Sequence, residues 1–410
     1  MGDLTVELYG SPIGRLSGSW QTFDFHAEPD AVRRYGLDSL ILSVAIPLAV
    51  VTSRSNRRRR QAFFAGLLPE GRMLSRMADE AAVATYDTIG LLRRYGRDIA
   101  GALQIWDADD PGEPRTPATE PLSERAVAEL LARVGDEPLA NRPVGGKTSL
   151  AGVQDKIVLA RTADGWAQVL DGYPSTHILK PETIGHPSMI YDEEYGSRFA
   201  RALGLAEFET RLETFDTTPA LVIERYDRNP RETGNQRIHQ EDFSQALGLS
   251  GDQKYQRHGG GASLARVAST LARHAEPGSL RTLLMLTTLS VAIGNLDLHT
   301  KNISLLHRTD QSITPAPAYD VVPQTHLPND GALALMIAGK YQHAAISRDD
   351  LVREAAGWGL RDAAKIIDDT LDRVLDVTAS ELPDPRAYAG LLADIARFAS
   401  NLRAGRPVGG

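Results

Sequence analysis

The first residues of the chain alternate between apolar and polar side chains. Leu4, Val6 and Leu8 would share one face of an extended backbone, because successive side chains of a strand point to opposite faces. The pattern predicts a strand that opens a small sheet. Residues 40–51 are also rich in strand-forming side chains, and Pro47 would confine such a strand to a sheet edge or end it.

Helical periodicity follows this β-rich start. Residues 61–84 and 87–94 have apolar positions three or four apart, which predicts helices. Residues 107–121 are rich in Pro, Asp, Glu and Thr, a composition typical of a surface linker. We therefore expect an N-terminal subdomain over residues 1–110.

A second group of apolar runs follows the linker. After an amphipathic helix at 122–134, four runs separated by turn residues predict strands, at 156–161, 166–171, 177–180 and 218–223. We expect residues 111–228 to complete an N-terminal lobe.

The remaining chain, residues 229–410, is dominated by helical periodicity. Beyond a helix expected at 192–203, the pattern predicts helices at 242–249, 263–274, 280–293, 362–377 and 385–402. The run from Leu283 to Ile293 is mostly apolar and carries no charge, which is typical of a helix buried on all sides. We expect this C-terminal lobe to end in a frayed tail.

Composition narrows the class of protein. The 410 residues, 42% hydrophobic and 24% charged, are enough for two or three globular domains. There is no cysteine and no run as long as a membrane span, so we expect a cytoplasmic protein with no membrane partner. The net charge of −8 argues against a protein that coats nucleic acid through its overall field. Arg57 to Arg60 form either a local basic patch or a solvated charge run.

The densest group of polar side chains directly follows the buried run. Asp297, His299, Lys301 and Asn302 lie within six residues. Asp297 and Asn302 have the spacing of the protein-kinase catalytic loop, in which the Asp receives the substrate hydroxyl proton and the Asn holds a magnesium ion. Asp320, after a predicted hairpin, supplies the second magnesium ligand that this chemistry needs.

Upstream segments fit a nucleotide site. The glycine-rich stretch 143–156 lacks the full P-loop motif, but it could bind phosphate through backbone N–H groups or be an ordinary turn. Lys180 ends a predicted strand, as a phosphate ligand or a surface lysine. Glu194 would pair either with Lys180, as in protein kinases, or with Arg198 one helical turn away. Residues 224–228 follow a predicted strand and are either a hinge that offers backbone groups to adenine or simply a strand end that enters a loop.

Seven segments carry a combined signal, at residues 64–70, 149–156, 177–180, 224–228, 238–242, 294–302 and 318–320. In this order they resemble the HipA family, the serine/threonine kinase toxins of bacterial toxin–antitoxin systems. The resemblance spans most of the chain. It implies an α+β, two-lobed, protein-kinase-like fold with a β-rich N-terminal subdomain, an all-helical C-terminal lobe and bound ATP.

The resemblance also implies residue roles. Asp297 would be the catalytic base, Asn302 and Asp320 would hold Mg²⁺, and Ser149 would be autophosphorylated, which withdraws its loop and silences the kinase. The implied ATP-binding residues are Ala151, Gly152, Val153, Gln154, Asp155, Lys156, Lys180, Glu224, Arg225, Tyr226, His299, Thr300, Lys301, Asn302, Tyr319 and Asp320.

The family's biology supplies the implied partners. Such a toxin phosphorylates a translation factor, such as an aminoacyl-tRNA synthetase, and a HipB-like helix-turn-helix antitoxin neutralises it on operator DNA. One alternative is a co-repressor in that DNA complex without essential kinase activity. Another is a metal-dependent hydrolase whose ligands would be Asp297, His299, Asp320 and His326.

Overall fold

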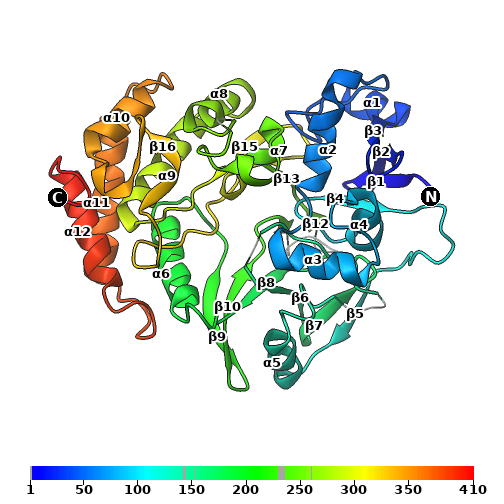
Figure 1. The fold of residues 1–410 in the computed structure, drawn as a ribbon, viewed down its shortest axis with the longest axis horizontal. Helices are drawn as coiled ribbons and strands as arrows, with labels where there is room; N and C mark the ends of the chain where they lie inside the picture. Colours follow the sequence, from blue (N-terminus) through cyan, green and yellow to red (C-terminus); the bar gives the residue numbers. More distant parts are fainter. Residues whose placement is uncertain (1, 142–144, 153, 230–235, 260) are drawn as a thin grey trace. The chain divides into compact units, whose positions relative to one another are not determined.

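The computed structural model describes residues 2–141, 145–152, 154–229, 236–259 and 261–410 (Figure 1). They form two compact units. The first comprises Met1–Pro181, Glu213–Glu241 and Leu306–Gln311, and the second comprises Glu182–Leu212, Asp242–Leu305 and Ser312–Gly410.

The first unit begins with a four-stranded antiparallel sheet. Its strands are β1 (Leu4–Leu8), β2 (Ser11–Ser17), β3 (Asp24–Ala27) and β4 (Leu103–Trp106), in the order β3-β2-β1-β4. Leu4, Val6 and Leu8 are fully buried, which confirms the predicted strand. The helices of this region are α1 (Pro29–Tyr35), α2 (Arg57–Ala65), α3 (Gly71–Glu80) and α4 (Thr88–Tyr95), with a short 3-10 helix, η1 (Arg54–Asn56), before α2.

Residues 40–51 do not form the strand that their composition predicts. Leu42 and Leu48 are fully buried in the core of the first unit. The backbone N–H of Val44 donates to a carboxylate oxygen of the buried Glu241 at 2.8 Å. The β-forming side chains therefore reflect burial, while a side chain rather than a neighbouring strand satisfies this part of the backbone.

The largest sheet has six strands. They are β5 (Ala118–Pro121), β6 (Ile157–Thr162), β7 (Gly165–Leu170), β8 (His177–Pro181), β9 (Thr210–Phe215) and β10 (Thr218–Glu224), in the order β5-β7-β6-β8-β10-β9. Apolar residues of α5 (Glu124–Ala132) share a core cluster with these strands. The four predicted strands correspond to β6, β7, β8 and β10 and are confirmed, and the expected linker adds β5 to the sheet edge. A two-residue pair, β11 (Arg228–Asn229) and β12 (Gln236–Arg237), follows.

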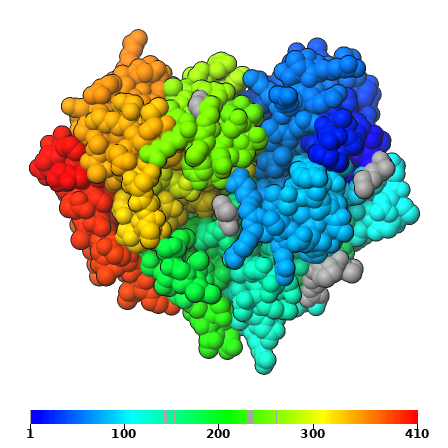
Figure 2. Space-filling model, in the orientation of Figure 1, coloured from blue at the N-terminus to red at the C-terminus, as the bar shows by residue number. Residues whose placement is uncertain are grey.

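Helices dominate the second unit. They are α6 (Met189–Ala202), α7 (Phe243–Leu247), α8 (Leu264–His274), α9 (Ser279–Ile293), α10 (Arg348–Ala356), α11 (Ala363–Ser380) and α12 (Leu391–Arg403). α9 packs against α6, α8, α10, α11 and α12, which confirms the prediction of a buried central helix. In the space-filling view, α11 and α12 contribute adjoining surface, coloured orange to red (Figure 2).

The C-terminal region is mainly helical rather than all-helical, which corrects one detail of the expected fold. It includes strands of a three-stranded sheet, β13 (His239–Asp242), β14 (Ser304–His307) and β15 (Ile313–Pro315), and the hairpin of β16 (Ala332–Ile337) and β17 (Lys340–Gln342). Three short 3-10 helices are η2 (Gly251–Lys254), η3 (Thr300–Asn302) and η4 (His343–Ala345).

The C-terminal tail is docked rather than frayed. Val408 is fully buried, and its N–H donates to the carbonyl oxygen of Ile346 at 2.9 Å. Apolar burial therefore holds a tail whose glycines suggested disorder. In the part of the chain that the structure describes, no helix is both long and apolar enough to cross a membrane.

Candidate active site

The candidate catalytic loop begins where α9 ends. Gly294 adopts a left-handed conformation with φ of 74°. A Cβ at this position would lie 2.8 Å from a side-chain carbon of Thr325, so the turn requires glycine. The side chain of Asn295 then accepts the backbone N–H of Asp297 at 3.0 Å. The backbone is thus fixed immediately before the candidate base.

The structure brings Asp297 and Asn302 together, as their spacing predicts. The side-chain nitrogen of Asn302 donates to the backbone oxygen of Asp297 at 2.9 Å, and η3 turns the chain between them. The Asp297 side chain is 39% exposed, and His299 Nε2 lies 3.8 Å from its carboxylate. An accessible carboxylate beside a fixed amide is what the kinase loop chemistry requires.

Tyr319 connects the segment of Asp320 to the same loop. Its hydroxyl donates to the carbonyl oxygen of Lys301 at 2.7 Å. Asp320 is exposed and has φ of 51°, a backbone conformation that few residue types other than Gly, Asn and Asp adopt. On the α6 side, a Cβ at Gly196 would collide with the carbonyl oxygen of Val321. The segment of Asp320 is therefore held by a hydroxyl group and by a closely packed helix.

The side-chain oxygen atoms of Asn302 and Asp320 suit a hard cation. The amide nitrogen of Asn302 is used by Asp297, so Oδ1 is the atom that remains for a ligand. This oxygen and the Asp320 carboxylate form the type of donor pair that Mg²⁺ prefers. The residues therefore fit the ion that the loop pattern implies.

Among the residues of the hydrolase alternative, His326 contacts a different carboxylate from the proposed ligands. His326 Nε2 lies 3.2 Å from Asp192, and its ring stacks on Tyr388 at a centroid distance of 4.3 Å. Within the described ranges, no three His, Cys, Asp or Glu side chains form a group that could hold a metal ion. The hydrolytic centre therefore has no structural support.

The side chains of Thr300 and Lys301 contact other side chains of the second unit. The buried Thr300 hydroxyl lies 2.8 Å from Ser244 Oγ. Lys301 Nζ lies 3.5 Å from a carboxylate oxygen of Asp242, which also caps the N-terminus of α7. These contacts stabilise the loop, and a role for either residue in ATP binding stays a prediction.

Ser149 is fully buried in the first unit. Its hydroxyl donates to the carbonyl oxygen of Leu67 at 3.0 Å, and its N–H donates to that of Asp98 at 3.0 Å. Both partners belong to the N-terminal region. A kinase acting on this hydroxyl would first have to break these contacts.

The glycine-rich loop after Ser149 folds around the amino group of Lys156. Lys156 Nζ donates to the carbonyl oxygen of Ala151 at 3.1 Å. Gly152 has φ of 116°, and a Cβ there would lie 2.6 Å from that nitrogen. Of the other predicted loop residues, Gln154 and Asp155 are half-buried, and Val153 lies outside the described residues.

One of the two contacts predicted for Glu194 is present. Its carboxylate accepts two N–H groups of Arg198, at 2.9 Å and 2.7 Å, so it forms the pair along the helix. Lys180 is buried in β8, where it lies opposite Leu221 of β10.

The predicted hinge contains an ion network that the sequence does not reveal. Arg225 binds Asp227 at 2.7 Å, and Arg228 binds Asp98 at 3.0 Å. Burial alone would raise the pKa of Asp227, but the two guanidinium groups hold it well below its usual range. Asp98 is more than a hundred residues away in sequence, so spacing gives no sign of the contact.

Of the other predicted hinge residues, Glu224 ends β10 and the Tyr226 hydroxyl forms a hydrogen bond with the side chain of Gln240.

The basic run is only partly available to a ligand. Arg60 is buried and binds Asp24 through two contacts of 2.5 and 2.9 Å, and Arg57 lies 3.3 Å from the same carboxylate. Arg58 and Arg59 are exposed. Half of the predicted patch therefore stabilises the fold.

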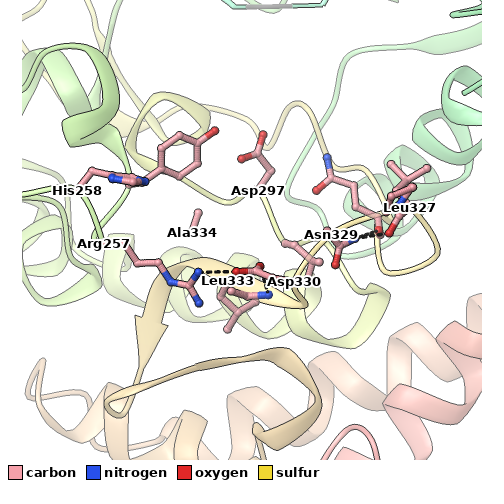
Figure 3. Close-up of a pocket in the computed structure, with 13 residues that line it drawn as sticks. Arg257, His258, Asp297, Leu327, Asn329, Asp330, Leu333 and Ala334 are labelled. Carbon is pink, nitrogen blue, oxygen red and sulfur yellow. Dashed lines mark hydrogen bonds and ion pairs between the residues drawn. The ribbon is translucent and has the colours of Figure 1, made fainter. Parts of the chain in front are cut away.

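A groove of about 380 Å³ lies beside Asp297 in the second unit (Figure 3). Sequence reasoning missed its walls, because they come from separate segments with no shared motif. Besides Asp297, the lining residues are Tyr255, Arg257, His258, Leu296, Gln324, Leu327, Pro328, Asn329, Asp330, Ala332, Leu333 and Ala334.

Comparison with known proteins assigns the fold to a family. Residues 4–106 match the HipA N-terminal domain, and residues 148–378 match the HipA-like C-terminal domain. The chain belongs to the HipA family. The family relatives include the serine/threonine-protein kinase toxin HipA of Shewanella oneidensis, 31% identical over 338 residues, which cover 78% of this chain and 75% of that protein.

A further relative and a solved structure support the assignment to the HipA family. Y4mE of Sinorhizobium fredii is 32% identical over 357 residues, covering 85% of this chain and 84% of that protein. In the solved complex of Shewanella oneidensis MR-1 HipA, HipB and its operator DNA, one chain aligns with a TM-score of 0.77 and 26% identity, over 98% of this chain and 96% of that one. The predicted HipA-like, kinase-like fold is thus confirmed.

Proposed function

We propose that this chain is a HipA-like toxin, an ATP- and Mg²⁺-dependent kinase that phosphorylates a serine or threonine of a protein. The main support is the catalytic-loop geometry. An accessible Asp297 carboxylate lies beside the Asn302 amide, and Tyr319 ties the Asp320 segment to this loop.

Phosphoryl transfer depends mainly on positioning and on charge neutralisation. The acceptor hydroxyl oxygen attacks the γ-phosphorus, the bond to the bridging oxygen breaks, and ADP leaves with that electron pair. The hydroxyl proton passes to Asp297. Mg²⁺ held by Asn302 and Asp320 would neutralise triphosphate charge.

The remaining predicted residues take part in nucleotide binding in this proposal. Backbone N–H groups of the loop 151–156 and the ammonium of Lys180 bind phosphate oxygens. Residues 224–226 bind adenine through their backbone, and His299 lies near the γ-phosphate.

Replacement of the candidate base tests the proposal. Asp297→Asn keeps the side-chain shape but removes the proton acceptor, so transfer should fall by about 10²–10⁴-fold while ATP affinity is retained. Transfer of labelled phosphate and binding of a fluorescent ATP analogue measure the two quantities. Asp349→Asn, at an exposed position of α10, is the matched control. Near-normal transfer by Asp297→Asn would reject the assignment.

The proposal includes the partners that the family suggests. The solved relative was crystallised with HipB and operator DNA, and we propose a HipB-like antitoxin and operator DNA as partners of this chain. The proposed acceptor is a translation factor such as an aminoacyl-tRNA synthetase, whose phosphorylation would inhibit growth. Phosphosites that appear after brief expression of the wild type, but not of Asp297→Asn, would identify it.

A second candidate function is co-repression without essential kinase activity. The exposed Arg58 and Arg59 support a local contact with DNA. If this function applies, Asp297→Asn keeps full repression with the antitoxin, whereas Arg58→Ala with Arg59→Ala weakens DNA binding and its salt dependence. Loss of repression in Asp297→Asn would reject it.

A further inference from the structure

Apart from Asp297, the residues that line the groove have no part in the nucleotide chemistry proposed above. Its volume of about 380 Å³ is within the usual range of ligand sites, about 300–1,000 Å³. Figure 3 shows Asp297 at one side and the Arg257–Asp330 ion pair at another. An occupant of this groove would therefore lie next to the candidate base.

The floor of the groove is apolar. Leu296, Leu333 and Ala334 are buried, and Leu327 and Pro328 line the adjoining wall. An apolar side chain placed here would be removed from water by these neighbours, which favours its binding.

The charges of the groove argue against a phosphate ligand. Arg257 lies 2.7 Å from Asp330, and its guanidinium also covers the ring of Tyr341 at 4.6 Å. The hydrogen bond from Arg257 lowers the pKa of Asp330, so both partners are charged near neutral pH and offset each other. Because Arg257 and Asp330 offset each other, Asp297 gives the lining a net negative charge. This charge disfavours a triphosphate of about four negative charges.

The walls of the groove are fixed by hydrogen bonds. On β16, the N–H of Ala334 donates to the carbonyl oxygen of Leu296 at 2.9 Å, and its carbonyl oxygen accepts the N–H of Gln256 at 3.1 Å. The Gln256 side chain also accepts the N–H of Met336 at 2.9 Å. These bonds occupy both backbone groups of Ala334 and the N–H of Met336, which favours recognition of an occupant through its side chain rather than as an added strand.

We propose that this groove binds an apolar side chain close in sequence to the acceptor serine or threonine of a protein substrate. The inference rests on the proposed kinase function. The apolar floor selects the side chain, the Arg257–Asp330 pair disfavours charged residues at that position, and the adjacent hydroxyl lies at Asp297.

A positional library of serine peptides, phosphorylated by the full chain with labelled ATP, tests the proposal. At one fixed position near the serine, Leu, Ile, Met or Phe should be preferred over Asp, Glu, Lys and Arg by about tenfold or more, the size expected for a buried side chain. A library without any apolar preference would overturn the proposal.

Two variants distinguish a change in the preferred peptide side chain from a general folding defect. Ala332→Trp fills the groove and should raise the KM of the best peptide about tenfold or more while the KM for ATP is unchanged. Ala345→Trp, at an exposed position outside the groove, is the matched control. Asp330→Asn leaves Arg257 without its carboxylate partner and should shift the preference toward Asp and Glu.

The possible outcomes are distinct. An unchanged peptide preference in both Ala332→Trp and Asp330→Asn overturns the groove assignment while the kinase proposal stands. A wild-type protein that binds ATP but phosphorylates no peptide also overturns it. A wild-type protein that neither binds ATP nor transfers phosphate overturns the proposed function and the groove assignment together.

Discussion

The hydroxyl group of Tyr319 connects the Asp320 segment to the candidate catalytic loop. The Tyr319 hydroxyl donates to the carbonyl oxygen of Lys301 and lies 2.5 Å from Ser304 Oγ. The two candidate metal ligands come from separate segments, so their relative position depends on such contacts. At the scale of single residues, we therefore expect the Tyr319 hydroxyl to help position the two candidate ligands.

Removal of this hydroxyl should therefore affect metal use more than stability. Tyr319→Phe should cost about 1 kcal/mol of folding free energy, lower kcat and raise the Mg²⁺ concentration needed for half-maximal activity. Titration of activity with Mg²⁺ and thermal unfolding measure these effects. Tyr86→Phe, which removes the hydroxyl of an exposed tyrosine, is the control. An unchanged Mg²⁺ requirement would contradict the positioning role.

A buried histidine should make the stability depend on pH. Burial lowers the pKa of His239 to about 3, with a smaller effect from the facing His307. His307 binds Glu241, and the His239 ring lies 2.7 Å from the carbonyl oxygen of Leu42. His239 is therefore neutral in the folded protein but takes up a proton in the unfolded chain below the ordinary histidine pKa of 6.5.

The sign of this effect is defined by the lowered pKa. As pH falls from 6.5 toward 3, His239 should reduce stability by up to about 1.4 kcal/mol per pH unit. The variant His239→Gln removes the titrating group, so its unfolding midpoint should decline less with falling pH than that of the wild type. Parallel curves for the two proteins would contradict this assignment.

At the scale of elements, α2 shows how one charge run serves two purposes. Arg60 faces Asp24 in the interior, whereas Arg59 faces solvent. Burial raises the pKa of Asp24, but hydrogen bonds from Arg60 and Arg57 lower it below its usual value overall. The pair therefore anchors α2 to β3.

Breaking this pair should destabilise the first unit. Arg60→Ala leaves a buried carboxylate without its main partner and should cost about 3–5 kcal/mol. Arg59→Ala, one residue away and exposed, should change stability by less than about 0.5 kcal/mol. Denaturant unfolding followed by circular dichroism compares the two. Equal effects of the two substitutions would mean that the run is a uniform surface patch.

Elements with regular periodicity were predictable from the sequence, and irregular ones were not. The apolar run of α9 and the Asp297–Asn302 spacing depend on neighbouring residues, so both were found. The segment 40–51 was misjudged, because its backbone partner Glu241 is about two hundred residues away. The groove was missed for the same reason, since Arg257 and Asp330 meet only when the chain is folded.

At the scale of the whole molecule, the buried Ser149 makes the N-terminal region part of the proposed regulation. A phosphate on its hydroxyl would bring about two negative charges against the carbonyl oxygen of Leu67, so the segment would have to leave its site. The hydrogen bonds from Ser149 to Leu67 and Asp98 therefore oppose phosphorylation and favour the buried position of the Ser149 segment.

Mass spectrometry after incubation with ATP and Mg²⁺ tests this proposal. Ser149→Ala should abolish autophosphorylation, because it removes the acceptor hydroxyl. Transfer to other proteins should be intact, because the substitution removes a single oxygen atom and should disturb the fold little. The wild type should lose activity as the phosphate accumulates, and the variant should not. A phosphosite at another residue, or equal loss of activity in both proteins, would contradict the assignment.

The contact between Gly196 and the carbonyl oxygen of Val321 has a consequence for sequence variation. Every other amino acid adds at least a Cβ, which would displace the segment that starts at Asp320. A saturation survey of α6 should therefore record Gly196 as intolerant to all substitutions, although it supplies no group for chemistry. Gly196 would then vary as little as a catalytic residue, because there is no space for a side chain at this position.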